Sequence, residues 1–125
     1  MKKYAEIQIR RVYEPAAESD GKRFLTDRLW PRGLKKEALR IDGWLKEVAP
    51  TDKLRKWFGH EPAHWDEFQK RYRTELAGQV ENWQILLAAT KKGKVTLLFS
   101  ARNVEHNNAA VLKSFLEAQI KNDGE

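Results

Sequence analysis

The sequence predicts an α/β domain whose small, at least partly parallel sheet has helices packed on its faces. Short strand patterns lie near both ends of the chain, and segments with helical apolar spacing lie between and after them. The run KVTLLFSA, residues 94–101, is apolar on both faces, as is typical of a central strand in a parallel sheet. A length of 125 residues suits one such domain, which we assign to residues 1–125.

The composition favours a folded, cytoplasmic protein. Hydrophobic residues make up 41% of the chain, with five Trp, five Phe and three Tyr, which is enough apolar surface for a core. The absence of cysteine excludes disulfides, thiolate metal sites and cysteine nucleophiles, and suits a reducing compartment. The N-terminal stretch MKKYAEIQIRRVYEP lacks an apolar signal core, so we predict neither a signal peptide nor a membrane partner.

The net charge of +6 is concentrated in the first half of the chain. Residues 1–56 hold fifteen Lys/Arg against nine Asp/Glu, whereas residues 57–125 hold nine against nine. Two interpretations stay open at this point. The excess is either an ordinary solvated basic surface or a face that attracts anions.

Two short strands are expected in the first third of the chain. Residues 7–13, IQIRRVY, alternate apolar and polar side chains and are followed by Glu14-Pro15. A second strand is expected at 23–27. Pro31 and Gly33 interrupt regular secondary structure, so residues 28–33 are expected to form an irregular segment. The second half of the stretch from 34 to 51 has no clear period and is not assigned.

Four helices follow, each with an apolar stripe. The first is capped by Thr51 and ended by Gly59, the second begins at Pro62, and the third covers about 81–91. The last begins between Asn103 and Asn107, and residues 122–125 are predicted to fray. The side chains expected in the stripes are Leu54, Trp57, Phe58, Trp65, Phe68, Tyr72, Leu76, Trp83, Leu86, Leu87, Val111, Leu112, Phe115, Leu116 and Ile120.

The segment FGHEPAH, residues 58–64, spells the H-E-x-x-H motif of zinc peptidases. That motif requires two imidazoles one turn apart on a continuous helix. Pro62 and Gly59 both break such a helix, so His60 must precede the helix that carries His64. We therefore reject a zinc peptidase and predict no metal and no cofactor, while His60 remains free to face a site.

The segment LLFSARNVEHNNA, residues 97–109, carries a buried strand into a helix. In parallel sheets this junction collects backbone N–H groups and a positive helix end, where anions bind. Arg102, His106 and Asn107 are candidate ligand-binding residues there; alternatively, Arg102 pairs with a surface carboxylate and Asn107 only caps the helix. No Gly-x-Ser-x-Gly elbow surrounds Ser100, so a serine nucleophile is not supported.

The segment DRLWPRG, residues 27–33, supplies a second group of candidates. Arg28 and Arg32 offer planar donors for phosphate or carboxylate, and Trp30 offers a flat surface for stacking. The alternative places Trp30 in the core and pairs Arg28 with Asp27 or another carboxylate. If the strand at 23–27 runs parallel to the strand at 94–100, both groups of candidates line one crevice.

These segments resemble the YeaO-like proteins of domain-of-unknown-function family 488 (DUF488). The resemblance rests on VYEP…DGKRFLTDRLWPRGLKK, IDGWLKEVAP, LRKWFGHEPAHWDEFQKRYRTEL and VTLLFSARNVEHNNAAVL, and covers about residues 8–118. It implies a small cytoplasmic bacterial or archaeal α/β domain that is not a peptidase. It supplies no catalytic residues, and the family pattern often has alanine at the position of Ser100.

The favoured function is binding of an anionic small molecule, such as a nucleotide or another phosphorylated metabolite, in an Arg/His-lined crevice. A nucleic-acid-associated regulatory module is the alternative, because helices at 52–58 and 62–77 resemble a helix-turn-helix in outline. Asp66 and Glu67 in the first turns of the second helix would repel DNA. If the crevice performs chemistry, His60 or His106 is the candidate general acid or base.

Overall fold

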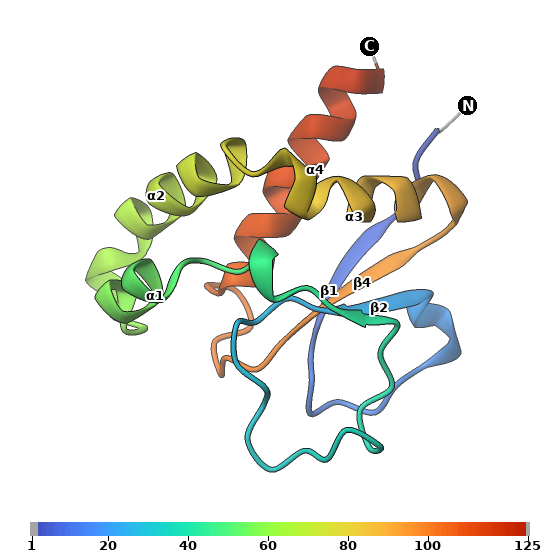
Figure 1. Cartoon of the computed structure of the whole chain (residues 1–125), viewed down its shortest axis with the longest axis horizontal. Coiled ribbons are helices and arrows are strands. Elements are labelled where there is room, and N and C mark those ends of the chain that lie inside the picture. Colours follow the sequence, from blue (N-terminus) through green and yellow to red (C-terminus); the bar gives the residue numbers. More distant parts are fainter. Residues whose placement is uncertain (1–2, 125) are drawn as a thin grey trace.

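The computed structural model describes residues 3–124 and confirms the α/β fold. Its sheet has the strand order β1-β4-β2-β3, and every pair of neighbouring strands is parallel (Figure 1). The strands are β1 (Ile7–Arg11), β2 (Lys22–Leu25), β3 (Gly43–Trp44) and β4 (Val95–Phe99). None of the helices in the described part of the chain has both the length and the apolar character needed to cross a membrane.

Strand β4 lies in the middle of the sheet, which explains its continuous apolar sequence. All five of its residues are buried, and it pairs with β1 on one side and β2 on the other. Strand β3, within the segment that the sequence left unassigned, consists of Gly43 and Trp44 alone and pairs with Phe24 and Leu25. Two residues are too few to produce a recognisable strand pattern.

Three helix boundaries lie where local sequence signals placed them. Thr51 Oγ1 accepts a hydrogen bond from the Leu54 backbone N–H, Gly59 adopts the left-handed conformation, and Asn107 Oδ1 caps the last helix at Ala110 N. The chain forms α1 (Asp52–Phe58), α2 (Trp65–Ala77), α3 (Val80–Lys92) and α4 (Asn108–Gly124), and the 3₁₀ turns η1 (Glu18–Asp20), η2 (Lys46–Val48) and η3 (Pro62–His64).

Two helix boundaries differ from the sequence prediction. Pro62 begins the 3₁₀ turn η3, and the α-helical hydrogen bonding of α2 starts only at Trp65. Helix α4 continues to Gly124, whereas the sequence predicted fraying from residue 122; Glu125 lies outside the described residues.

Helices α3 and α4 pack against one face of the sheet, α2 packs on α4 and α1 packs on α2, and all four share one apolar core (Figure 1). Alternate residues of β4 point into this core, as the pleat of a strand requires. The predicted helical stripes also contribute most of the buried side chains. The core contains Ile7, Phe24, Val48, Leu54, Phe58, Phe68, Tyr72, Leu76, Trp83, Leu86, Val95, Leu97, Phe99, Ala109, Val111, Leu112, Phe115 and Leu116.

An irregular segment, not a helix, covers the opposite face. Residues 26–42 connect β2 to β3 without regular secondary structure. Their Leu39 packs with Leu25 and Leu98 from the sheet, and Trp30 and Trp44 lie against this smaller cluster. The helices therefore occupy one side of the sheet, whereas the long connection leaves the carboxyl end of β2 and runs over the other side to the start of β3.

The rest of that face carries a buried ionic network centred on Asp20. The Asp20 carboxylate is fully buried and accepts hydrogen bonds from Arg10 at 2.8 Å, Arg23 at 3.3 Å and Gln8 at 3.0 Å. Burial alone would raise the pKa of Asp20. Bonds from the Ala17 backbone N–H and from Arg10, with the charges of Arg10 and Arg23, lower that pKa below its ordinary value.

Replacing Asp20 with asparagine is expected to destabilise the fold by about 3 kcal/mol at pH 7, because the buried Arg23 loses its counter-charge. Folding lowers the pKa of Asp20, so the stability from its carboxylate is present above the ordinary pKa of 3.8 and is lost as the pH falls through the folded value. The difference between wild type and Asp20→Asn in urea unfolding should therefore shrink in acid. Glu18→Gln, an exposed change in the same turn, is the control; equal stability of Asp20→Asn and wild type at pH 7 contradicts this role.

Gly21 is required at the entry to β2. Its φ of 66° lies in the left-handed region, and a Cβ there would collide with the Lys94 carbonyl oxygen, which accepts the Lys22 N–H. We expect Gly21→Ala to destabilise the protein by about 3 kcal/mol or more, since both backbone strain and a steric clash oppose it.

Gly33→Ala is the matched control for Gly21→Ala. Gly33 has a φ of 77°, but a Cβ there meets open space, so only the conformational cost of about 1 kcal/mol applies. Denaturant unfolding of both variants measures the difference. Equal losses would show that the contact with Lys94 does not limit position 21.

Candidate functional site

A cavity of about 1100 Å³ lies at the carboxyl ends of β2 and β4. Its walls come from the segment after β2, the segment after β4, and the end of α1 with the turn that follows it. Parallel sheets commonly bind ligands at this edge. Because β2 and β4 are parallel neighbours, the two groups of residues predicted from sequence do emerge at the same edge.

The lining of this cavity is strongly cationic. Among the described residues, six Lys or Arg side chains line it, and the one carboxylate in the lining belongs to Asp27. His60 also contributes. The six cationic residues are Arg11, Arg28, Arg32, Arg55, Lys56 and Arg102. The positive half of the sequence thus supplies most of a concentrated cationic surface, to which Arg102 is added by the fold.

Hydrogen bonds to backbone carbonyl groups hold two of the arginines in place. Arg28 donates from Nε to Pro50 O at 3.0 Å and from an Nη to Ala49 O at 3.3 Å. Arg11 donates to Ser100 O at 3.0 Å and to Ala101 O at 2.8 Å. Carbonyl acceptors orient a guanidinium group but do not neutralise it, so both positive charges remain available to a ligand.

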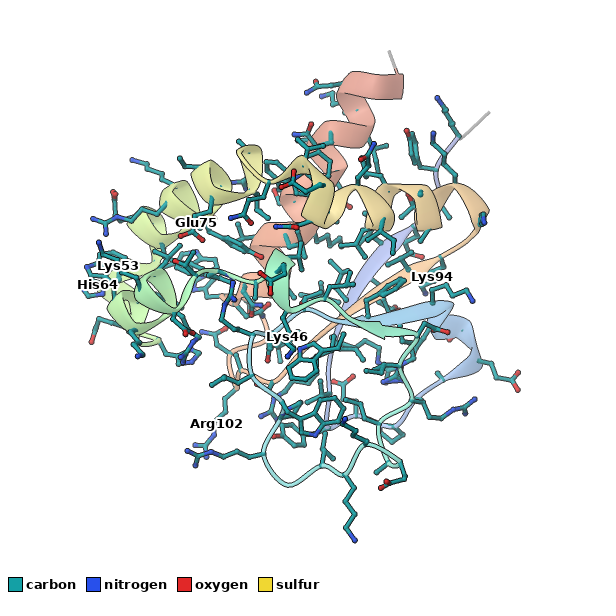
Figure 2. All side chains as sticks on the ribbon, viewed as in Figure 1. Lys46, Lys53, His64, Glu75, Lys94 and Arg102 are labelled. Atoms are coloured by element: carbon teal, nitrogen blue, oxygen red, sulfur yellow. The ribbon has the colours of Figure 1, made fainter. Side chains whose placement is uncertain are left out.

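The four other cationic side chains have unused donors. In residues 3–124 the side chains of Arg32, Lys56 and Arg102 form no hydrogen bond or ion pair, and Figure 2 shows Arg102 projecting from the loop after β4. Arg55 donates to Asp52 Oδ1 at 3.3 Å, but its Nε is buried without a partner in the same part of the chain. A buried donor without a partner is uncommon in folded proteins and marks a place for an acceptor.

Asp27 is half-buried, lines the cavity and accepts hydrogen bonds from neutral donors. Its Oδ2 accepts bonds from the Ser100 backbone N–H at 2.9 Å and from Ser100 Oγ at 2.7 Å, and its Oδ1 accepts from Asn108 Nδ2 at 3.2 Å. Burial raises the pKa of Asp27, and these bonds and the nearby His60 oppose the increase. Ser100 is thus a structural donor to Asp27, and Arg28 does not pair with Asp27.

His60 lines the cavity from a turn that breaks the H-E-x-x-H pattern. Both Gly59 and His60 have left-handed backbone conformations, with φ of 52° and 59°. His64 faces elsewhere: its ring stacks on Trp57, and its Nδ1 lies 3.0 Å from Trp57 O. The two histidines therefore do not converge, and no group of three potential metal-ligating side chains gathers within residues 3–124.

The other predicted residues are divided between the cavity and its surroundings. Asn107 lines the cavity and caps α4, whereas Trp30 lines it and also donates from Nε1 to Leu34 O, 2.6 Å away. His106 does not line the cavity, because its ring stacks on Trp65 with centroids 4.5 Å apart. The candidates that the fold brings to the cavity are Arg28, Trp30, Arg32, His60, Arg102 and Asn107.

Several lining residues were not singled out by sequence. Arg11 follows the alternation of β1, and Arg55 and Lys56 fit the polar face of a short helix, so none carries a local signal. Asp27 and Asn108 did carry a sequence signal. Asp27 lies shortly after the end of a strand, and Asn108 lies at the start of the helix that follows the neighbouring parallel strand. Residues in these two positions are expected to meet at the sheet edge.

Replacing Ser100 with alanine is expected to raise the pKa of Asp27 further, because the Ser100 hydroxyl donates to the ionised carboxylate. The titration of the Asp27 ¹³Cγ chemical shift measures this change. Ser114→Ala makes the same substitution on α4, away from Asp27, and should leave the titration unchanged. An unchanged titration in Ser100→Ala would mean that the hydroxyl does not stabilise the carboxylate.

Comparison with known proteins places the chain among similar sequences. The model of the family DUF488-N3i, described as "Inactive DUF488-N3 subclade", matches residues 6–125. Uncharacterized protein YeaO of Escherichia coli (strain K12) is 46% identical over 112 residues, which cover 90% of this chain and 97% of YeaO. Uncharacterized protein Rv3073c of Mycobacterium tuberculosis (strain ATCC 25618 / H37Rv) is 37% identical over 119 residues, covering 95% of this chain and 100% of that protein. No solved structure matches the chain.

Proposed function

The chain belongs to the DUF488-N3i family of YeaO-like proteins, and from its cationic cavity we propose that it binds an anionic small molecule, a nucleotide or another phosphorylated metabolite. The observation that carries this proposal is the lining of six Lys or Arg side chains against one Asp. Like charges brought together at one edge repel each other, and a phosphate or carboxylate ligand relieves that repulsion.

The donors of the cavity are suited to phosphate. Guanidinium groups offer planar pairs of N–H donors, which match the oxygens of a phosphate or carboxylate. Arg28 and Arg11 are fixed by carbonyl groups, so little side-chain entropy is lost when they bind. The exposed Arg102 and Lys56 add two further donors to the lining.

The aromatic part of the lining supports a nucleotide among phosphorylated ligands. The rings of Tyr13, Trp30, Phe58 and Phe68 contribute to the walls, but Phe58 and Phe68 are buried in the core. Tyr13 is exposed and Trp30 is half-buried, and flat rings of this kind stack on a nucleobase while the arginines hold its phosphate. The volume, about 1100 Å³, is sufficient for a molecule of nucleotide size.

Binding is better supported than catalysis. The description of the matching family contains the word "Inactive". The Ser100 hydroxyl donates to Asp27, and His106 stacks on Trp65 outside the cavity, so His60 is the histidine positioned to transfer a proton to or from a ligand. The absence of cysteine supports a cytoplasmic location for this binding protein.

Arg102→Ala is expected to weaken the binding of pyrophosphate and AMP about tenfold, since a charge-assisted hydrogen bond contributes about 1.5–3 kcal/mol. The melting temperature without ligand should stay the same, because Arg102 is exposed and has no partner in residues 3–124. Isothermal titration calorimetry and thermal shift measure the two quantities.

Lys53→Ala is the control for Arg102→Ala. It removes one positive charge from an exposed position on α1 that does not line the cavity (Figure 2). Equal weakening by the two variants, or no binding of either ligand to the wild type, contradicts the proposal. Tighter binding of short RNA or DNA, with an affinity that falls steeply with salt, would favour a nucleic-acid-associated regulatory module instead.

A further inference from the structure

Asp27 is an unexpected residue in a site for anions. Of the side chains that line the cavity in residues 3–124, it alone carries a carboxylate. None of the six cationic neighbours forms an ion pair with it; its partners are Ser100 and Asn108, which are neutral. A carboxylate in this position repels a bare anion, so its presence needs a reason other than anion binding.

The carboxylate of Asp27 retains room for one more donor. Each carboxylate oxygen accepts about two hydrogen bonds. Oδ2 already receives both the backbone N–H and the hydroxyl of Ser100, whereas Oδ1 receives the Asn108 amide alone. Oδ1 therefore has one acceptor position left, and Asp27 lines the cavity.

The partners of Asp27 also fix its orientation. Ser100 follows β4, and Asn108 begins α4, where its amide additionally donates to Thr26 O at 3.0 Å. The carboxylate is thus held from two elements and cannot turn away when a ligand enters. An acceptor held in this way discriminates between ligands, because a ligand that lacks the matching donor leaves it unpaired.

We infer that Asp27 is the specificity-determining residue of the cavity and accepts a hydrogen bond from a hydroxyl or N–H group of the bound molecule. The ligand class is then a phosphate or carboxylate that also carries hydrogen-bond donors, such as a sugar phosphate or a nucleotide, and not a bare polyanion. This inference rests on the proposed anion binding and adds the second group that the ligand must carry.

Ligand affinities distinguish a specificity-determining Asp27 from one that only joins two loops. A purely structural Asp27 would affect the stability of the protein and would change its affinity for all anions alike. If Asp27 determines specificity, its replacement lowers the affinity for anions that carry donors and leaves unchanged or raises the affinity for anions without donors. Ribose 5-phosphate and ethyl phosphate are suitable probes, since both carry one phosphate and only the first carries several hydroxyl groups.

In Asp27→Asn we expect ethyl phosphate to bind as tightly as in the wild type or up to a few-fold tighter, because a negative charge is removed from the cavity. Ribose 5-phosphate should bind about tenfold more weakly, because its hydroxyl group loses a charged acceptor. AMP and ribose 5-phosphate losing affinity together identifies the sugar hydroxyls as the donor. A loss for AMP alone identifies the N–H group of the base.

Asp66→Asn is the matched control, since it makes the same change at an exposed position outside the cavity. A parallel shift of ethyl phosphate, ribose 5-phosphate and AMP in Asp27→Asn overturns the inference. If that variant does not fold, the wild type still decides, because equal affinities for all three ligands refute a role for the donor while leaving anion binding intact. Failure of the wild type to bind any of the three probes refutes the proposed function and this inference with it.

Discussion

The parallel pairing of β2 with β4 is the contact on which the rest of the structure depends. It is bounded by two backbone hydrogen bonds, from Lys22 N to Lys94 O at its start and from Thr26 N to Leu98 O at its end. The first of these needs the close approach that Gly21 permits. The second places Asp27 directly beside Ser100, at the edge where the cavity begins. The pairing of β2 with β4 therefore also positions the residues at the edge of the cavity.

The two faces of the sheet are stabilised by different means. One face buries the apolar stripes of four helices, as expected for a parallel sheet. The other is divided between a small apolar cluster under residues 26–42 and the ionic network of Asp20. Removing Asp20 would leave the buried Arg23 without its counter-charge, and this loss costs more than the intact ion pair gains. The long connection after β2 also supplies Arg28, Trp30 and Arg32 to the cavity.

Within residues 3–124 the cavity combines hydrogen-bonded and exposed cationic groups around a single carboxylate. Arg11 and Arg28 are held by carbonyl groups that also belong to the loops of the site, so the arrangement of donors exists before a ligand arrives. In residues 3–124 two departures from an unstrained, fully bonded structure occur in the cavity wall, the left-handed conformation of His60 and the unpaired Nε of Arg55. The buried Nε of Arg23, outside the cavity, also lacks a partner in these residues. Such departures cluster at binding sites, where ligand contacts compensate for them.

The sequence by itself determined the features that depend on neighbouring residues in the chain. The cap at Thr51, the turn at Gly59 and Pro62, the cap at Asn107 and the apolar character of β4 are local signals, and the parallel α/β class follows from them. Arg28, Trp30, Arg32, His60, Arg102 and Asn107 could be placed near one edge because loops after adjacent parallel strands share that edge.

Only the tertiary structure decided which side chains meet. The two-residue strand β3, the carbonyl partners of Arg11 and the burial of Arg55 Nε arise between segments that are distant in sequence. The stacking of His106 on Trp65, which keeps His106 from facing the cavity, is another contact between segments that are distant in sequence. Asp27, which the sequence offered as a partner for Arg28, is likewise bonded to the distant Ser100 and Asn108 instead. Periodicity and capping report on a few consecutive residues, whereas these contacts depend on the register between strands and on the packing of rings across elements.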